Sequence, residues 1–278
     1  MGTIAITGAT SGIGEEAAVA LAHAGHRILI IGRNRERGEA VLERVGAANR
    51  KAQHRLHIAD LSLVAEARRL ADTLAYEETR LDVLANNAGA IFERREETRE
   101  GLERTFATDH LGPWVLTNQL IPLLRSSGAR VIQTSSIAHR GARLNGDDWQ
   151  LRQGWSSWRA YCNAKLMNIL MTRELRRREA RLTAVAFHPG FISSRFGTAA
   201  EGMSGLGGLA QRLVGKSPEM GARTLVHLAT ADLGRDPALY WANRKSAGVS
   251  RQAGDDGLAT KLWAESARLA DHLAAVPA

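Results

Sequence analysis

Short apolar runs rich in isoleucine, valine and leucine alternate along this chain with longer segments of helical period. Continuous apolar runs are typical of strands that are buried on both faces of a sheet. Repeated alternation of strand and helix requires a parallel sheet with helices on both faces and right-handed crossovers. The sequence therefore predicts an α/β fold, a single doubly wound domain with a parallel sheet of about seven strands.

The boundaries of the expected elements follow from these patterns. Strands are expected at residues 4–7, 27–31, 55–58, 83–86, 130–134, 183–187 and 238–241. Helices are expected at residues 13–24, 35–45, 64–73, 97–124, 158–178 and 218–229. No internal repeat or linker-like stretch interrupts the alternation, so residues 1–278 are expected to form one domain.

The composition is that of a soluble globular protein. Of 278 residues, 44% are hydrophobic and 24% charged, which is enough apolar material for a core and excludes disorder over most of the chain. The single cysteine, Cys162, excludes an internal disulfide and a thiolate zinc cluster, and we expect no metal site. Met1 and Gly2 lead directly into the first strand, and no run approaches the about 18 apolar residues that span a bilayer. We expect a cytoplasmic protein without a membrane span.

A charge surplus raises the question of a polyanionic partner. The chain has 37 basic and 29 acidic side chains, a net charge of +8, and nucleic acids and membrane surfaces both attract such proteins. The basic residues are mostly arginines scattered through the sequence, and the clump at 173–181 is typical of the C-terminal end of a helix. Without a recognition motif, we expect no nucleic-acid partner.

A glycine-rich turn, Thr7 to Gly14, follows the first strand and opens the first helix. Gly8 permits a tight turn, Gly12 lets the backbone approach a pyrophosphate, and Gly14 allows close packing of the helix. The helix N-terminus then offers unpaired N–H groups and a favourable dipole to an anion. This context predicts a Rossmann-type, dinucleotide-binding fold. The turn residues expected at the cofactor are Gly8, Thr10, Ser11, Gly12, Ile13 and Gly14.

The end of the second strand indicates which dinucleotide is bound. An NAD site usually has Asp or Glu there for the ribose 2′-hydroxyl, whereas NADP requires a cation for the 2′-phosphate. This strand ends in Gly32, Arg33 and Asn34, and the first carboxylate is Glu36. Because a guanidinium can grip a phosphate and stack on adenine, Arg33 favours NADP(H), with Asn34 beside it.

Two long segments without a clear period are expected to border the substrate, at about 137–158 and 195–216. Long irregular loops in compact α/β domains are usually lids or binding loops. Five aromatic side chains lie in or next to them: Trp149, Trp155, Trp158, Phe191 and Phe196. The pattern predicts an apolar, aromatic pocket for a small hydrophobic or polycyclic molecule, although some of the tryptophans are expected only to pin the loop.

Several motifs together resemble the short-chain dehydrogenase/reductase family over nearly the whole chain. They are the glycine turn, Asp60-Leu61, Asn86-Asn87-Ala88-Gly89, Ser136, Tyr161 with Lys165, and Pro189-Gly190 followed by Ser194. Stretches such as DHLGPWVLTNQLIPLL, SSIAH, AYCNAKLMN and HPGFISS are similar to the retinol-dehydrogenase-like branch.

The resemblance implies further cofactor contacts and an oxidoreductase activity. It places Asp60 and Leu61 beside the adenine and Asn87, Ala88 and Gly89 along the cofactor. It places Pro189, Gly190, Ile192 and Ser194 around the nicotinamide, and Tyr161 and Lys165 at the cofactor as well as in catalysis. Dimers and tetramers occur in the family, so the resemblance also suggests a homo-oligomer.

The residue types of the implied catalytic set explain its chemistry. Tyr161 and Lys165 are four residues apart on an expected helix and therefore share a face. A free tyrosine titrates near pH ~10, and a nearby ammonium lowers that pKa toward the working pH. Ser136 would hydrogen-bond the substrate oxygen and stabilise developing charge. The family motif selects Ser136 over Ser135, since only one of the two can face the cleft.

One position departs from the family pattern. The family has a catalytic asparagine in a motif resembling Asn-His-Leu-Gly, and this chain has Asp109 there, in Thr108-Asp109-His110-Leu111-Gly112. A carboxylate near Lys165 could pair with the ammonium and partly cancel its effect on Tyr161. Asp109 is therefore an uncertain catalytic residue: a tolerated substitute, which we rank first, a sign of altered chemistry, or a mark of weakened activity.

The sequence thus predicts an NADP(H)-dependent oxidoreductase that interconverts a carbonyl and an alcohol, with Tyr161 as acid/base. Two alternatives stay open. One is a relative with altered or non-redox chemistry, suggested by Asp109, and the other is a cofactor-binding regulatory protein. The intact set of Ser136, Tyr161 and Lys165 argues against the regulatory alternative.

Overall fold

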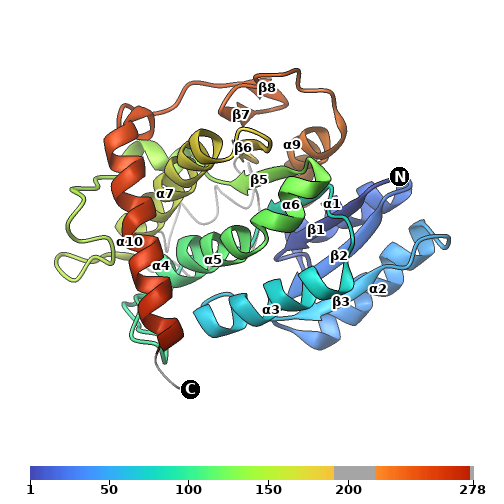
Figure 1. Ribbon diagram of the computed structural model, residues 1–278, viewed down its shortest axis with the longest axis horizontal. Coiled ribbons are helices and arrows are strands. Elements are labelled where there is room, and N and C mark those ends of the chain that lie inside the picture. Colours follow the sequence, from blue (N-terminus) through green and yellow to red (C-terminus); the bar gives the residue numbers. More distant parts are fainter. Residues whose placement is uncertain (191–216, 276–278) are drawn as a thin grey trace.

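An eight-stranded sheet runs through the computed structural model, which describes residues 1–190 and 217–275 (Figure 1). Its strand order is β3-β2-β1-β4-β5-β6-β7-β8, and every neighbouring pair is parallel except the last. The strands are β1 (Thr3–Thr7), β2 (Arg27–Gly32), β3 (Arg55–Ile58), β4 (Val83–Asn86), β5 (Arg130–Thr134), β6 (Thr183–His188), β7 (Tyr240–Ala242) and β8 (Lys245–Ser246). This confirms the α/β class and the doubly wound parallel sheet.

Side chains of successive strand residues enter two separate cores, one on each face of the sheet. In β2, Leu29 and Ile31 join one buried cluster, and Ile28 and Ile30 join the other. All four are fully buried, which explains why the strand reads as a continuous apolar run.

Helices cover both faces (Figure 1). One face carries α1 (Gly12–His23), α2 (Arg35–Ala48) and α9 (Pro218–Thr230). The other carries α3 (Val64–Glu77), α5 (Gly112–Gln119), α7 (Ser157–Arg178) and α10 (Asp256–Ala275). The shorter elements are α4 (Arg104–Phe106), a π-helix (Ala107–Leu111), α6 (Ile121–Ser127), and 3₁₀ turns at Ile137–Gly141 and Gln252–Gly254.

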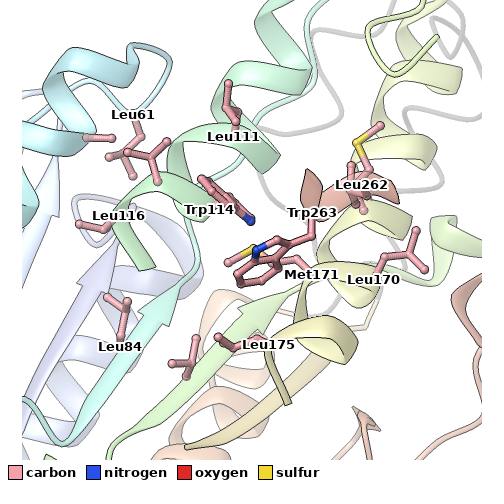
Figure 2. Close-up of a cluster of buried hydrophobic side chains, with 14 of the residues drawn as sticks. Leu61, Leu84, Leu111, Trp114, Leu116, Leu170, Met171, Leu175, Leu262 and Trp263 are labelled. Carbon is pink, nitrogen blue, oxygen red and sulfur yellow. The ribbon is translucent and has the colours of Figure 1, made fainter. Parts of the chain in front are cut away.

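The C-terminal helix α10 closes the core on the second face. It packs against α7 and α3, and Trp263 meets Trp114 of α5 edge to face, with ring centroids 5.3 Å apart. Figure 2 shows this tryptophan pair among buried side chains that include Leu170 and Leu175 of α7. Because α7 also carries Tyr161 and Lys165, this packing fixes the helix that presents both.

The described strands β1 to β7 form the expected parallel sheet, and the chain then turns back at Asn243 and Arg244, both with positive φ, and adds the antiparallel β8. One expected helix requires correction, and one helix was missed. The single helix expected at 97–124 is wrong: Glu97 and Glu103 form an antiparallel bridge, and the helical segments begin only at Arg104. Helix α10 was not expected.

The two expected loops have different outcomes. In the first, residues 137–141 form a 3₁₀ turn and residues 142–156 have no regular structure until α7 begins at Ser157. The second, 195–216, lies outside the described residues, as do Phe191, Ile192, Ser194 and Phe196. No helix in the described ranges is long and apolar enough to cross a membrane.

Candidate active site

The strand order reverses between β1 and β4, which are neighbours in the sheet although their crossovers leave in opposite directions. In such sheets, ligands bind in the crevice at the carboxyl ends of the two strands. The turn after β1 and the segment after β4 meet there. The Thr7 hydroxyl accepts hydrogen bonds from the N–H groups of Asn87 and Ala88, both at 2.9 Å. Thr7 was not singled out from the sequence, because its role depends on this long-range contact.

The glycines of the first turn are required by this close approach. Gly8 has φ +65°, and a Cβ on it would lie 2.8 Å from the Ala88 Cα. A Cβ on Gly14 would lie 2.4 Å from the Gly8 carbonyl oxygen and 2.6 Å from Asn87 Nδ2. Gly12 has φ +60° and open space beside it. The backbone at the N-terminus of α1 therefore lies bare along the crevice, as phosphate binding requires.

The end of β2 lies against the same turn. A Cβ on Gly32 would lie 2.4 Å from the Thr10 Cγ2, so the end of β2 touches the glycine-rich turn. Arg33, the next residue, therefore lies beside that turn. The Arg33 side chain is exposed. Asn34 has a structural role in this structure, since its Oδ1 accepts from the Arg37 N–H at 2.8 Å and caps α2.

The expected adenine-side pair follows β3. Asp60 Oδ1 accepts from the Ser62 N–H at 2.9 Å, and Leu61 is 5% exposed. On the nicotinamide side, Pro189 and Gly190 follow β6, and Gly190 has φ +95° with its N–H donating to His188 Nδ1. The remaining expected contacts on that side, Ile192 and Ser194, lie outside the described residues.

The structure brings Ser136, Tyr161, Lys165 and Asp109 together from three elements. Tyr161 and Lys165 lie one turn apart on α7, and Lys165 Nζ is 5.3 Å from the centre of the Tyr161 ring. Ser136 follows β5, and its side chain lies close enough to Tyr161 to lower the pKa of the phenol. Asp109 lies in the π-helix, a rare bulge that is frequent at functional sites.

Asp109 and Lys165 form a buried ion pair with Nζ and Oδ2 2.9 Å apart, and their side chains are 0% and 4% exposed. The other carboxylate oxygen, Oδ1, accepts from the Ala90 N–H at 2.8 Å. A Cβ on Gly89 would lie 2.8 Å from Lys165 Nζ and 3.0 Å from Asp109 Oδ2, so a larger residue there would displace the ion pair. The contact anticipated between Asp109 and Lys165 is present.

Burial and charge together set the protonation states. Burial raises the pKa of Tyr161; Lys165 and the hydrogen bond with Ser136 oppose this rise, and Asp109 adds to it. Burial alone would lower the pKa of Lys165, but Asp109 and Tyr161 outweigh it, so the pKa lies above its ordinary value. Lys165 is therefore an ammonium at neutral pH, and Tyr161 carries its proton there.

The two serines after β5 face different partners. Ser135 is 2% exposed and its hydroxyl donates to the Lys165 carbonyl at 2.7 Å, so it holds α7 to the sheet. Ser136 is partly exposed, its Oγ accepts from the Ala138 N–H at 3.2 Å, and its side chain lowers the pKa of Tyr161. Only the Ser136 hydroxyl faces the phenol.

A serine substitution pair tests this difference. Ser136→Ala should lower turnover about 10²–10³-fold, the usual cost of one donor that stabilises developing charge. Ser135→Ala should retain most of the turnover because its hydroxyl is committed to the α7 backbone. Steady-state kinetics of both variants with one substrate give the comparison, and a reversed order of the two losses would contradict the assignment.

His139 is a further member of the site that the sequence reading did not single out. Its Nδ1 lies 2.7 Å from the Ser136 carbonyl oxygen, its Nε2 accepts from the Ser250 N–H at 3.2 Å, and Tyr240 Oη lies 3.4 Å from Nδ1. Burial lowers its pKa, and the two contacts fit a neutral ring with the proton on Nδ1. The only sequence signal was its place three residues after Ser136.

Two other residues near the site are buried groups with structural roles. Cys162 is a buried thiol, and burial raises its pKa to about 11, so it is no nucleophile. His110 is fully buried with Nε2 2.8 Å from the Ser266 hydroxyl, and burial lowers its pKa to about 3. Across residues 1–190 and 217–275, no three His, Cys, Asp or Glu side chains are grouped for metal binding, and the absence of a metal stays a prediction.

Comparison with known proteins identifies the family that the sequence motifs resemble. The family described as short chain dehydrogenase matches residues 2–203. Human retinol dehydrogenase 13 is 35% identical over 96% of this chain and 84% of its own length. A Streptomyces protein named as a daunorubicin C-13 ketoreductase is 36% identical over 95% of this chain and 91% of its own length.

A crystal structure of an uncharacterized protein from Mycobacterium paratuberculosis superposes with a TM-score of 0.77 and 33% identity, covering 98% of this chain and 94% of the other. This match over 98% of the chain, the glycine turn and the Ser136–Tyr161–Lys165 set all point to the same family as the two relatives. The chain belongs to the short-chain dehydrogenase family, in its retinol-dehydrogenase-like branch.

Proposed function

We propose that this protein is an NADP(H)-dependent oxidoreductase that interconverts a carbonyl and an alcohol on a small hydrophobic or polycyclic substrate. The observation that carries the proposal is the convergence of Ser136, Tyr161 and Lys165 at the crevice where the sheet order reverses. Relatives named as a retinol dehydrogenase and a ketoreductase are similar to this protein in sequence over almost its full length.

The described residues fit a dinucleotide. The bare backbone at Gly8 and Gly12 and the start of α1 would hold the pyrophosphate. Arg33 would bind the 2′-phosphate, and no carboxylate stands at the end of β2 to favour NAD. When bound, the nicotinamide supplies or accepts a hydride.

The chain's own residues handle the substrate oxygen and the proton. Ser136 would donate a hydrogen bond to that oxygen and hold it against Tyr161. Tyr161, whose pKa is raised chiefly by burial, carries the proton that a newly formed alkoxide takes up. Lys165 opposes the rise in the Tyr161 pKa, and its ammonium would hold the hydroxyls of the nicotinamide ribose.

The function is tested by following cofactor consumption across hydrophobic ketones, aldehydes and alcohols. NADPH oxidation with at least some carbonyl compounds is the expected result, and Tyr161→Phe is the matched inactive control. Tight NADPH binding with no turnover across a broad panel would contradict the proposal.

Cofactor choice is tested at Arg33. Arg33→Glu should lower kcat/KM for NADPH by about 10–100-fold, the loss expected when charged hydrogen bonds to a phosphate are removed, and should change kcat/KM for NADH far less. Arg35→Ala is the control, because Arg35 is exposed on the first turn of α2 and lies 3.7 Å from Glu39. A wild-type preference for NAD of about tenfold or more would refute the assignment.

The Asp109–Lys165 ion pair favours one second candidate, a cofactor-binding protein whose catalysis is weakened. An ammonium paired with a carboxylate is less available to the ribose and lowers the pKa of Tyr161 less. The two candidates differ in one measurable respect. A weakened enzyme should gain reductase rate in Asp109→Asn, whereas a tolerated substitution should leave the rate unchanged.

A further inference from the structure

The three tryptophans before Tyr161 have different surroundings. Trp149 is 7% exposed and belongs to the core. Trp155 donates from Nε1 to Glu103 Oε1 at 3.1 Å, which pins the loop to the body. Trp158, in the first turn of α7, is 56% exposed. Two of the three therefore hold the loop, and the third offers its ring to solvent.

Trp158 lies beside the proposed acid/base. It precedes Tyr161 by three residues on α7, so both side chains project from one side of the helix. Their ring centroids are 6.1 Å apart with an interplanar angle of 34°. Among the described residues the exposed large hydrophobic side chains are Met1, Tyr76, Trp158 and Met220, and Trp158 is the one whose ring contacts the Tyr161 ring.

An exposed indole at this place is a surface for a flat ligand. Exposing a large aromatic side chain forgoes the free energy of its burial, and stacking with a second planar π-system recovers part of it. Because the Trp158 ring lies next to the Tyr161 ring, with the centroids 6.1 Å apart, the carbon skeleton of a substrate whose oxygen meets the Tyr161 hydroxyl would extend beside the indole. A planar skeleton can lie in offset contact with the indole, whereas a puckered saturated skeleton touches it only at edges.

We propose that Trp158 is a specificity-determining residue that selects carbonyl compounds and alcohols attached to, or conjugated with, a planar aromatic ring system. The inference rests on the proposed oxidoreductase function, and it narrows the hydrophobic substrate class to its flat members. It assigns no proton or hydride transfer to Trp158. Trp158 should therefore affect mainly the KM of the substrate, and the pH dependence of the rate should depend on Tyr161.

The test compares two ketones of the same carbon skeleton, planar 2-acetylnaphthalene and its saturated counterpart 2-acetyldecalin, with the NADPH-loaded protein. Trp158→Leu should lower kcat/KM about tenfold for the planar ketone, chiefly through KM, and change it little for the saturated ketone. Trp158→Phe should retain most of the discrimination because it keeps a flat ring. Trp155→Phe, which removes the hydrogen bond to Glu103, is the control and should affect both ketones alike.

Binding separates this inference from the proposed function. Calorimetric titration of 2-acetylnaphthalene into the NADPH-loaded protein needs no turnover, and Trp158→Leu should weaken the affinity about tenfold. Turnover of both ketones with equal loss in Trp158→Leu, or equal affinity of wild type and variant, would overturn the role of Trp158 and leave the oxidoreductase function standing. Selective binding without any turnover would support Trp158 and count against the function.

Discussion

Tyr161→Phe should lower turnover about 10²–10⁴-fold, the range that a positioned acid/base contributes, while NADPH affinity stays close to that of the wild type. The substitution removes the hydroxyl and keeps the ring, whose centre lies 6.1 Å from that of Trp158 and 5.3 Å from Lys165 Nζ. Single-turnover kinetics and a cofactor titration on the same preparation separate the two effects. A loss of NADPH binding equal to the loss of turnover would instead give Tyr161 a cofactor-positioning role.

The neighbouring Cys162→Ala is the matched control. Cys162 is buried on another side of α7, and its pKa of about 11 keeps it a thiol at neutral pH. We expect its turnover to remain close to the wild-type value. A comparable loss in Cys162→Ala would mean that disturbance of α7, and not the hydroxyl, accounts for the result at Tyr161.

The pH dependence gives a second readout of the same group. The pKa of Tyr161 is raised, chiefly by burial, so the phenol keeps its proton through neutral pH. Carbonyl reduction uses the protonated form and should hold its rate at neutral pH and fall at alkaline pH. Alcohol oxidation uses the phenolate and should rise toward alkaline pH. In Tyr161→Phe the residual activity should show neither the alkaline fall of the reduction rate nor the alkaline rise of the oxidation rate.

The prediction for the cofactor end of the site rests on local patterns. The apolar run of β1, the glycines of the turn and the helix that follows are contiguous, and each glycine serves a neighbour that the motif already implies. Tyr161 and Lys165 share a face of α7 because of spacing alone. Asp109 was located by its departure from a family motif, and its ion pair with Lys165 is the contact expected from that position.

Other features depend on contacts between distant residues. The expected helix over 97–124 fails because the Glu103 carboxylate caps α4 at the Phe106 N–H and accepts from Trp155, 52 residues away. The π-helix that places Asp109 adds one residue to a helical turn, and periodicity does not reveal it. The roles of Thr7 and His139 likewise require the partners that β4 and the segment around Ser250 bring to them.

Lys165→Met should lower the free energy of unfolding by about 3–5 kcal/mol, because it leaves the Asp109 carboxylate buried without its partner. The double variant Lys165→Met/Asp109→Asn removes both charges and keeps an amide oxygen for the Ala90 N–H, so it should recover more than half of that loss. Equilibrium urea unfolding without cofactor provides the measurement. Lys245→Met, at an exposed position on β8, is the control and should change stability by less than about 0.5 kcal/mol.

The unpaired Asp109 carboxyl determines how the stability of Lys165→Met changes with pH. Burial raises the pKa of Asp109, and in Lys165→Met the opposing charge is gone, so the folded variant binds a proton at a pH where the unfolded chain does not. Its stability should therefore be highest in acid, below the unfolded pKa, and should fall as the pH rises through the folded pKa, so that the deficit relative to wild type shrinks in acid. If Lys165→Met were as stable as Lys245→Met at neutral pH, the buried carboxylate would already be neutral in the wild type, and Asp109 would act as a hydrogen-bonding substitute for asparagine with no charge to cancel.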